Sequence, residues 1–293
     1  IKENKNKKIM LAKGEVNNIK SLLDRNDIEY IEHNEKIRLN SDFIPFNINK
    51  TNATIAWNKS KGDGIKIAII DSGISQHYDL HIAGGISLIS ENYNANNGHG
   101  TAVAGIISAL LNGNGIAGVA PSADIYAVKI FENNEGDLFD AVEAIEWAID
   151  NDMDIISMSW GLNSYSKILE EALYKAYENG ILLIASSGND GENKILYPAH
   201  YQQVIAVGAV DKNNNRALFY NYGEELELVA PGVDIYTTNK NNNFSIMSGT
   251  SFATPHIAGI SALIKSYKNN LTNCHIREIL GKSAVDLGMQ GFD

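Results

Sequence analysis

Three residues in this chain have the types that hydrolyse an amide by nucleophilic attack. Asp71 follows four apolar residues in "IAIIDSG", His99 lies between glycines in "NGHGTAVAG", and Ser251 occurs in "GTSFATPH". A serine hydroxyl needs an imidazole to take its proton, and the imidazole needs a carboxylate that holds its tautomer and stabilises its charged form. Together the three residue types favour a serine hydrolase.

Two further residues suggest how negative charge would be stabilised. Pro255 follows Ser251 by four positions, and proline is tolerated in the first turn of a helix, where its missing N–H costs nothing. We therefore expect Ser251 near a helix N-terminus, where the helix dipole favours developing negative charge. Asn189 in "ASSGND" ends an apolar run, and its side-chain amide is a candidate hydrogen-bond donor to an oxyanion.

Each of these residues also has a purely structural interpretation. An aspartate such as Asp71 at the end of a strand is often a turn former or a helix cap, and a histidine between glycines is often a plain loop residue. The single cysteine, Cys274, is interpreted as a half-buried helix residue, not as a nucleophile. One cysteine also allows no internal disulfide.

The segments that must position these residues alternate between two patterns. Apolar runs at 65–73, 123–131, 153–161, 181–189, 203–210 and 225–232 predict buried strands, and helical spacing predicts helices over 139–152, 165–180 and 252–267. This alternation predicts an α/β fold with a mostly parallel, twisted sheet and helices on both faces. In such sheets ligands bind at the carboxyl ends of the strands, and Asp71, Ser159 and Asn189 are expected there.

The composition excludes several kinds of partner. The chain has 293 residues, 44% of them hydrophobic, and a formal net charge of −11. This charge disfavours binding to nucleic acid or to an anionic membrane. No apolar run reaches the roughly 18 to 20 residues needed to cross a bilayer.

Four segments, taken in order, resemble the signature blocks of the subtilisin-like serine proteases, the subtilases. They are "IIDSGI", "NGHGTAVAG", "SGND" and "GTSFATPH", and the similarity extends over roughly residues 42–288. The resemblance implies a catalytic triad of Asp71, His99 and Ser251, with Asn189 as the oxyanion donor. It also implies a monomeric endopeptidase that is secreted or at the cell surface, with the cytoplasm as the alternative; a membrane anchor stays open.

The resemblance further implies a groove in which a peptide or protein substrate binds as an added strand. The corresponding residues are Gly136, Ser159, Trp160, Gly161, Ser187, Gly188 and Leu196. Leu196 should narrow the floor of the pocket for the residue before the cut. Lys194 nearby either favours an acidic residue there or is simply a solvated surface lysine.

A structural Ca²⁺ is the one cofactor that the resemblance implies. Loop carbonyls, an amide oxygen and one or two carboxylates suit this ion. The corresponding residues are Asp42, Asp79, Leu110, Asn112, Asn114 and Ile116. The alternative is that "LLNGNGIAG" is only an Asn-Gly turn.

Residues 1–40 differ in composition from residues 41–293, and we expect two domains with this boundary. A strand over 7–13, a helix over 15–27 and a second strand over 28–39 would form a small N-terminal βαβ segment. It resembles the end of a subtilase propeptide, extended into the cleft and cut between Glu32 and Asp42. The end at "LGMQGFD" is expected to be a C-terminal truncation of the catalytic domain.

Three functions fit these observations. The first is a serine endopeptidase that is autoprocessed from a proenzyme. The second is a dedicated maturation protease, which would resemble the peptidases that remove leader peptides from lanthipeptides. The third is a non-catalytic peptide-binding module on a subtilase fold.

Overall fold

The computed structural model describes residues 2–4, 9–11, 13, 24–32, 41–95 and 97–287. The chain divides into two compact units, Ile1–Asn40 and Ser41–Asp293, and we describe each by itself.

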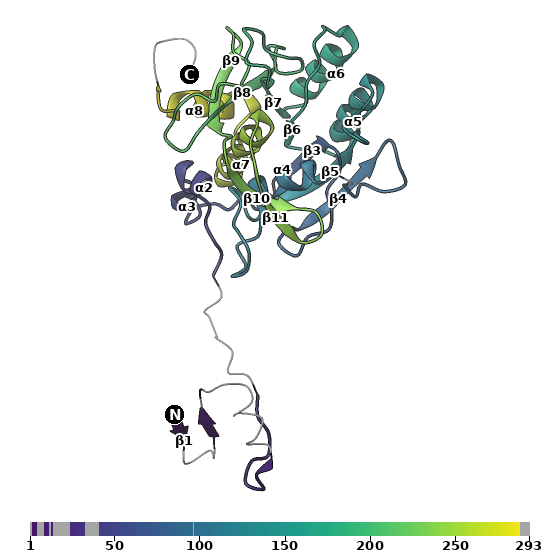
Figure 1. Cartoon of the computed structure of the whole chain (residues 1–293). Helices are drawn as coiled ribbons and strands as arrows, with labels where there is room; N and C mark the ends of the chain where they lie inside the picture. The colour runs from purple at the N-terminus through teal and green to yellow at the C-terminus, as the bar shows by residue number, and fades with distance from the viewer. Residues whose placement is uncertain are drawn as a thin grey trace. The chain divides into compact units, whose positions relative to one another are not determined.

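A seven-stranded sheet forms the centre of the second unit (Figure 1). Every neighbouring pair in it is parallel, which confirms the predicted mostly parallel sheet. The strands lie in the order β4 (Ile82–Ser87), β5 (Asp124–Lys129), β3 (Lys66–Asp71), β6 (Ile155–Met158), β7 (Leu182–Ser186), β8 (Val204–Val210) and β9 (Leu226–Pro231).

Four of the five inner strands, β3, β6, β7 and β8, are buried almost without interruption along their length. A strand covered on both faces has no polar side to show to water, so its residues form a continuous apolar run. This is why the sequence pattern located these strands. The edge strand β4 is only partly buried, contains two glycines, and was not predicted.

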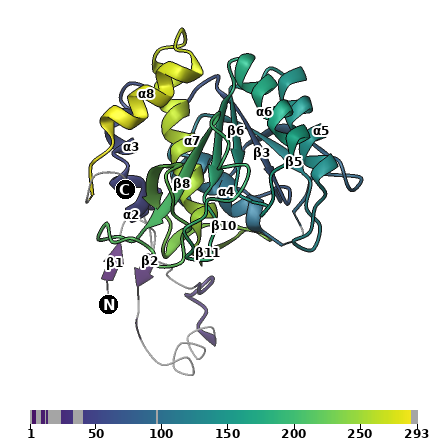
Figure 2. The same ribbon diagram turned by 90° about the horizontal axis from the view of Figure 1, so that it is seen from above.

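Helices cover both faces of the sheet, as predicted (Figure 2). Helix α4 (His99–Ser108) packs with α7 (Thr250–Tyr267) on one face, and α5 (Leu138–Asp150) packs with α6 (Lys167–Glu178) on the other. Three further described helices lie outside these layers: α2 (Phe46–Lys50), α3 (Ala53–Ala56) and α8 (Asn273–Ser283). Cys274 lies in α8 but is exposed, so the predicted half-buried position is wrong.

An antiparallel hairpin, β10 (Ile235–Asn239) and β11 (Asn243–Met247), packs on α4. The hydroxyls of Thr237 and Thr238 donate to the carbonyls of Ala102 and Thr101 in α4, at 2.8 and 2.7 Å. Because β11 ends just before α7 begins, this hairpin joins the first turns of α4 and α7, which carry His99 and Ser251.

In the described part of the first unit, β1 (Lys2–Asn4) and β2 (Ile9–Leu11) form an antiparallel pair. Strand β2 falls in the strand predicted over 7–13. Residues 28–32 form no strand, so the described part of the strand predicted over 28–39 is wrong, while 33–40 lie outside the described residues. Most of the helix predicted over 15–27 also lies outside them. Among the described helices, none is long and apolar enough to span a membrane.

Candidate active site

Asp71 and His99 meet at the carboxyl edge of the sheet. Asp71 is the last residue of β3, and His99 is the first residue of α4. The Nδ1 atom of His99 lies 2.8 Å from Oδ1 and 3.0 Å from Oδ2 of Asp71. The Asp71 side chain is 3% exposed and that of His99 is 30% exposed, so the ring links a buried carboxylate to the surface.

The Asp71 carboxylate determines which ring nitrogen of His99 is basic. An ionised carboxylate can only accept hydrogen bonds, so Nδ1 carries the proton and Nε2 is left with its lone pair. Burial opposes protonation of the ring and is the largest single effect, but the charge and the hydrogen bond of Asp71 outweigh it and raise the pKa of His99. The ring is therefore a stronger base than an isolated histidine.

Gly100 allows this close approach. A Cβ atom at this position would lie 2.3 Å from the carbonyl oxygen of Gly73 and 3.1 Å from Oδ1 of Asp71. Any side chain would therefore push the start of α4 away from β3 and separate His99 from its carboxylate. Steric crowding therefore explains why a glycine follows His99 in the sequence.

Ser251 lies at the start of the long helix α7, as expected. It is the second residue of this helix and is 9% exposed. Its hydroxyl donates to the carbonyl of Ser159 at 3.2 Å, and within the described residues no hydrogen bond joins it to His99. The neighbouring Phe252 ring lies 5.4 Å from the imidazole, so the two helix starts are adjacent. Catalytic hydrogen bonds of this kind often form only when substrate binds.

Pro255 corrects one sequence expectation. It was placed in the first turn, where a missing N–H costs nothing, but α7 begins at Thr250 and Pro255 lies inside it. The N–H of residue 255 would bond to the carbonyl of Ser251 in a regular helix. That carbonyl instead accepts the hydroxyl of Ser159, at 2.9 Å.

Asn189 is held beside the same helix start. It lies on the loop after β7 and is exposed. Its Oδ1 accepts the N–H of Thr250 at 2.9 Å and the hydroxyl of Thr250 at 3.0 Å. With Oδ1 bound in this way, the NH₂ group is the part of the Asn189 amide left to donate a hydrogen bond. As the second residue of α7, Ser251 also has a backbone N–H with no helical partner.

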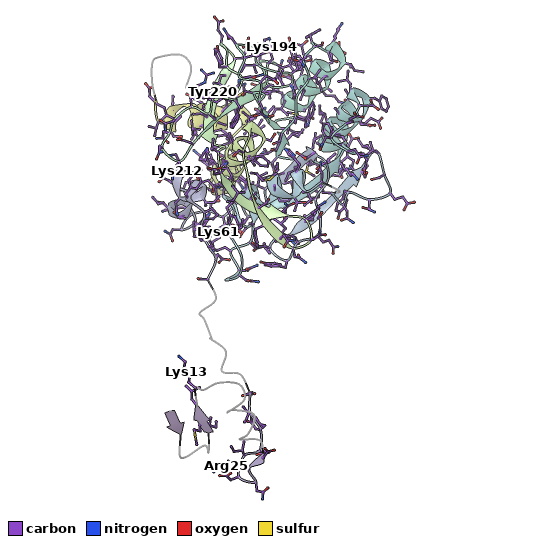
Figure 3. All side chains as sticks on the ribbon, in the orientation of Figure 1. Lys13, Arg25, Lys61, Lys194, Lys212 and Tyr220 are labelled. Carbon is purple, nitrogen blue, oxygen red and sulfur yellow. The ribbon has the colours of Figure 1, made fainter. Side chains whose placement is uncertain are left out.

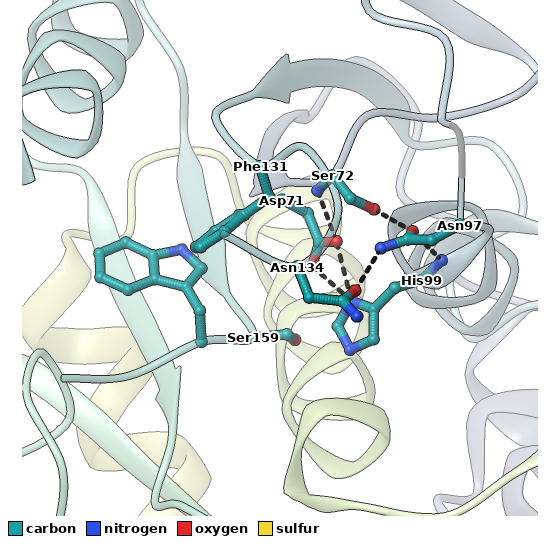
Figure 4. A pocket seen from close by; sticks show the side chains of 8 residues that line it. Asp71, Ser72, Asn97, His99, Phe131, Asn134 and Ser159 are labelled. Carbon is teal, nitrogen blue, oxygen red and sulfur yellow. Dashed lines mark hydrogen bonds and ion pairs between the residues drawn. The ribbon is translucent and has the colours of Figure 1, made fainter. Parts of the chain in front are cut away.

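An open pocket of about 160 Å³ has His99 in its lining (Figure 4). Its lining residues are Asp71, Ser72, Asn97, His99, Phe131, Asn134, Ser159 and Trp160. The Asn97 amide donates to Oδ1 of Asn134 at 2.8 Å, which joins the loop before α4 to the tight turn at 132–135. Of the predicted groove residues, Ser159 and Trp160 line this pocket, and Gly136 follows the turn.

Other predicted groove residues surround the Leu196 side chain. A Cβ atom at Gly161 would lie 2.9 Å from Cβ of Leu196, and one at Gly188 would lie 2.9 Å from Cδ1 of Leu196. The backbone of Ser187 accepts the N–H of Leu196 at 3.0 Å. Leu196 therefore fills the slot between the loops after β6 and β7. Lys194 lies on the surface and donates to Asn163 (Figure 3).

The predicted calcium ligands also come together. Both carboxylate oxygens of Asp42 accept backbone N–H groups of the loop at Asn112–Asn114. Asp79 is buried; its Oδ2 accepts the N–H of Ile116 at 2.8 Å, while its Oδ1 has no partner among the described residues. Burial, with the nearby charge of Asp42, raises the pKa of Asp79 to about 7, against the hydrogen bond from Ile116.

The described residues include no cluster of three or more His, Cys, Asp or Glu side chains that could hold a metal ion. Leu110 joins the loop through its N–H, which donates to the carbonyl of Asp79 at 2.9 Å. The Asn112 side chain accepts the N–H of Asn114 at 2.9 Å. Two carboxylates beside a loop of carbonyl and amide oxygens form a donor set of the type that hard cations prefer.

Sequence reasoning missed several residues of the site. Asn97, Asn134 and Phe131 line the pocket beside His99, and Thr250 orients Asn189. Position in the chain was the only signal available: Phe131 ends the apolar run at 123–131, which contains β5, and Thr250 precedes Ser251. The bond between Asn97 and Asn134 joins two distant loops, so no local pattern could reveal it.

Comparison with known proteins gives one consistent result. The sequence profile of the subtilase family matches residues 62–293. A thermostable alkaline protease of Halalkalibacterium halodurans is 46% identical over 274 residues, which cover 92% of this chain and 76% of that protein. The minor extracellular protease Epr of Bacillus subtilis is 45% identical over 94% of this chain but only 46% of its own length. Subtilisin BL of Lederbergia lenta is 43% identical over 84% of this chain and 93% of its own length.

Proposed function

This chain is a serine endopeptidase of the subtilase family, and from that premise we propose that Asp71, His99 and Ser251 are its catalytic triad. The observation that carries the proposal is the Asp71–His99 pair, which holds a basic Nε2 next to the start of α7. A non-catalytic binding module would need neither the buried carboxylate nor the oriented ring.

In the proposed mechanism, His99 Nε2 takes the proton of the Ser251 hydroxyl as Oγ attacks the substrate carbonyl. Asp71 keeps Nδ1 protonated and stabilises the imidazolium that forms. The ring then gives the proton to the leaving amine, and water hydrolyses the acyl-enzyme by the same steps in reverse. The NH₂ of Asn189 and the N–H of Ser251 would donate to the oxyanion.

The Ser251→Ala variant tests this assignment. Alanine is smaller and fits the same space, so the fold should persist, while peptidase activity should fall by more than roughly a thousandfold because no acyl-enzyme can form. A phosphonate that labels active serines should modify the wild-type chain at residue 251 and leave the variant unmodified. Activity of the variant within tenfold of wild type would refute the triad.

We propose that the loop at Leu110–Ile116 binds a structural Ca²⁺ with Asp42 and Asp79. The site fits because Asp79 presents a buried carboxylate oxygen that accepts no hydrogen bond from the described residues, within the electrostatic influence of a second carboxylate, Asp42. Leu110, Asn112, Asn114 and Ile116 would add carbonyl and amide oxygens. When bound, the ion would neutralise the two carboxylates and hold the segment at Asp42 to the loop.

We further propose that the first unit is a propeptide of this enzyme. Residues 1–40 contain nine Lys and Arg against seven Asp and Glu, a net charge of +2, which leaves −13 for the rest of the chain from the total of −11. Exposed apolar side chains occur on both units: Ile9, Met10 and Tyr30 in the first, and Phe139, Ile168 and Tyr174 on α5 and α6 in the second. N-terminal sequencing should find a new terminus between Glu32 and Asp42, and the Ser251→Ala chain should stay uncut.

The substrate preference is proposed from Leu196. Because its side chain fills the slot next to Gly161 and Gly188, we expect a small residue before the cleaved bond. A restricted pocket also suits a dedicated maturation protease, such as one that removes leader peptides. Cleavage of a peptide library should show a small residue at this position, and Leu196→Gly should admit large apolar residues there.

Secretion is proposed from the relatives. The B. subtilis relative is an extracellular protease by name, and other relatives are alkaline proteases by name. The proposed partners are a peptide or protein substrate and the chain's own propeptide, with the enzyme acting as a monomer.

A further inference from the structure

The carbonyl of Ser251 is a polar group that the helix itself cannot satisfy. Pro255 has no N–H, so the bond that would join residue 255 to residue 251 is missing from α7. Ser251 is nearly buried, and an unpaired buried carbonyl destabilises a structure by roughly as much as a lost hydrogen bond. Some other donor must hold this carbonyl if the position of Ser251 is to be fixed.

Ser159 is that donor, and the contact is reciprocal. The Ser159 hydroxyl donates to the carbonyl of Ser251 at 2.9 Å, and the Ser251 hydroxyl donates to the carbonyl of Ser159 at 3.2 Å. Ser159 is 5% exposed, so water does not compete strongly for its hydroxyl. Two hydrogen bonds thus join the start of α7 directly to the residue that follows β6.

The sheet places the contact between Ser159 and Ser251 close to the Asp71–His99 pair. Strand β6 lies next to β3, with Met158 paired to Ile70, so Ser159 and Asp71 are neighbouring strand ends. Asp71 positions His99 on one side, and Ser159 contacts Ser251 on the other. The nucleophile is therefore tied to the end of β6, the strand next to β3, which carries the carboxylate, and not only to its own helix.

We propose that Ser159 is a positioning residue for the nucleophile: its hydroxyl replaces the helical donor that Pro255 lacks and fixes the backbone of Ser251 relative to His99. This role rests on the proposed function of Ser251 and is separate from any contact that the backbone of Ser159 makes with substrate. The expected consequence is an effect on kcat more than on KM, because Ser251 does not change and only its placement does.

The experiment uses the full chain with Ser159→Ala, Pro255→Ala and the double variant. Loss of the Ser159 hydroxyl should lower kcat by roughly ten- to a hundredfold and change KM by less than about threefold, as loss of a buried hydrogen bond predicts. Pro255→Ala supplies a backbone N–H to the Ser251 carbonyl. In the Ser159→Ala background it should restore kcat at least about fivefold, although by itself it should not raise kcat.

Ser157→Ala is the matched control. Ser157 lies in β6, is 1% exposed, and its hydroxyl has no partner among the described residues. It should change kcat by less than about twofold, because it removes a buried hydroxyl from the same strand without touching Ser251. Each kcat is expressed per active site titrated with the phosphonate, so that misfolded protein does not lower the value.

A second pair of variants keeps the test valid if Ser159→Ala folds poorly. Ser159→Thr and Ser159→Val have nearly the same shape, and only the first retains a hydroxyl. The threonine variant should exceed the valine variant in kcat by roughly tenfold or more. Equal kcat in this pair, or no rescue by Pro255→Ala, would overturn the positioning role. If Ser251→Ala is inactive as expected, that outcome would leave the triad itself intact.

Discussion

Two buried aspartates, eight positions apart in the chain, have opposite surroundings. Asp71 receives the N–H of Ser72 at 2.7 Å and Nδ1 of His99 on both of its oxygens. Asp79 receives the N–H of Ile116 on one oxygen only, and its other oxygen has no partner among the described residues. The first carboxylate lies beside a group that can become a cation, and the second lies near another carboxylate, Asp42.

The two carboxylates differ in whether other groups of the chain compensate their negative charge. A buried carboxylate is tolerated when hydrogen bonds and an opposite charge replace the water it has lost. Asp71 meets this condition with groups of the chain itself. Asp79 does not, and the calcium proposed for its loop would supply the missing charge. Substituting each aspartate by asparagine, which has the same shape, should therefore give opposite phenotypes.

The largest effect is expected for Asp71→Asn. The amide cannot stabilise an imidazolium and favours the wrong tautomer of His99, so kcat should fall by about 10⁴-fold. The melting temperature should change little and should respond to calcium as in wild type. Peptide hydrolysis and thermal unfolding on the same sample measure both quantities. A fall in kcat of less than tenfold would show that the pairing of Asp71 with His99 is not catalytic.

A moderate effect on stability is expected for Asp79→Asn. At a hundredfold excess over Kd, a bound ion stabilises the folded state by about 2.7 kcal/mol, so chelation should lower the melting temperature of wild type by roughly 5–10 °C. The variant should lose this response and keep its kcat per active site. In the presence of chelator the order of thermal stability should reverse. Asp79→Asn should then be at least as stable as wild type, because its buried side chain carries no charge. A calcium response equal to that of wild type would contradict the site.

The smallest expected effect is a shift in the pKa of the His99 ring. The charge and hydrogen bond of Asp71 raise the pKa of His99 above its ordinary value of 6.5. The proposed role of His99 as general base requires the neutral ring. Activity should therefore be lost as the pH falls through this raised pKa. In Ser251→Ala, which prevents self-digestion, NMR should follow the titration of the His99 ring. Adding Asp71→Asn should lower this pKa, because only the effect of burial remains, and an unchanged value would contradict the electrostatic account.

The sequence predicted the elements whose residues form a continuous hydrophobic pattern. The inner strands form unbroken apolar runs, so their positions and the strand-end location of Asp71 followed from the pattern. The edge strand β4 is half exposed and interrupted by Gly84 and Gly85, and its pattern was too weak to identify. The hairpin β10–β11 is polar along much of its length and depends on its packing against α4.

The candidate site was predicted in its residue types but not in its contacts. Asp71, His99, Asn189 and Ser251 were selected because their chemistry fits hydrolysis. The role of Ser159 toward Ser251 was not visible, because it depends on where α7 begins. A helix start shifted by two residues would have placed Pro255 in the first turn, and sequence patterns do not fix helix ends that closely.

The strand order also determines how early the sheet can form while the chain is being synthesised. Strand β3 pairs with β5 and β6, both of which come later in the chain, so the Asp71 edge cannot form until the chain has been made past residue 158. Ser251 and its helix appear only after β7, β8 and β9. Chains are made from the N-terminus at about 5–20 residues per second, and parallel sheets with distant pairings fold slowly. If Ser251 is the nucleophile proposed above, a ribosome-bound chain would lack an assembled active site for most of its synthesis, and proteolysis would begin only after the second unit has folded.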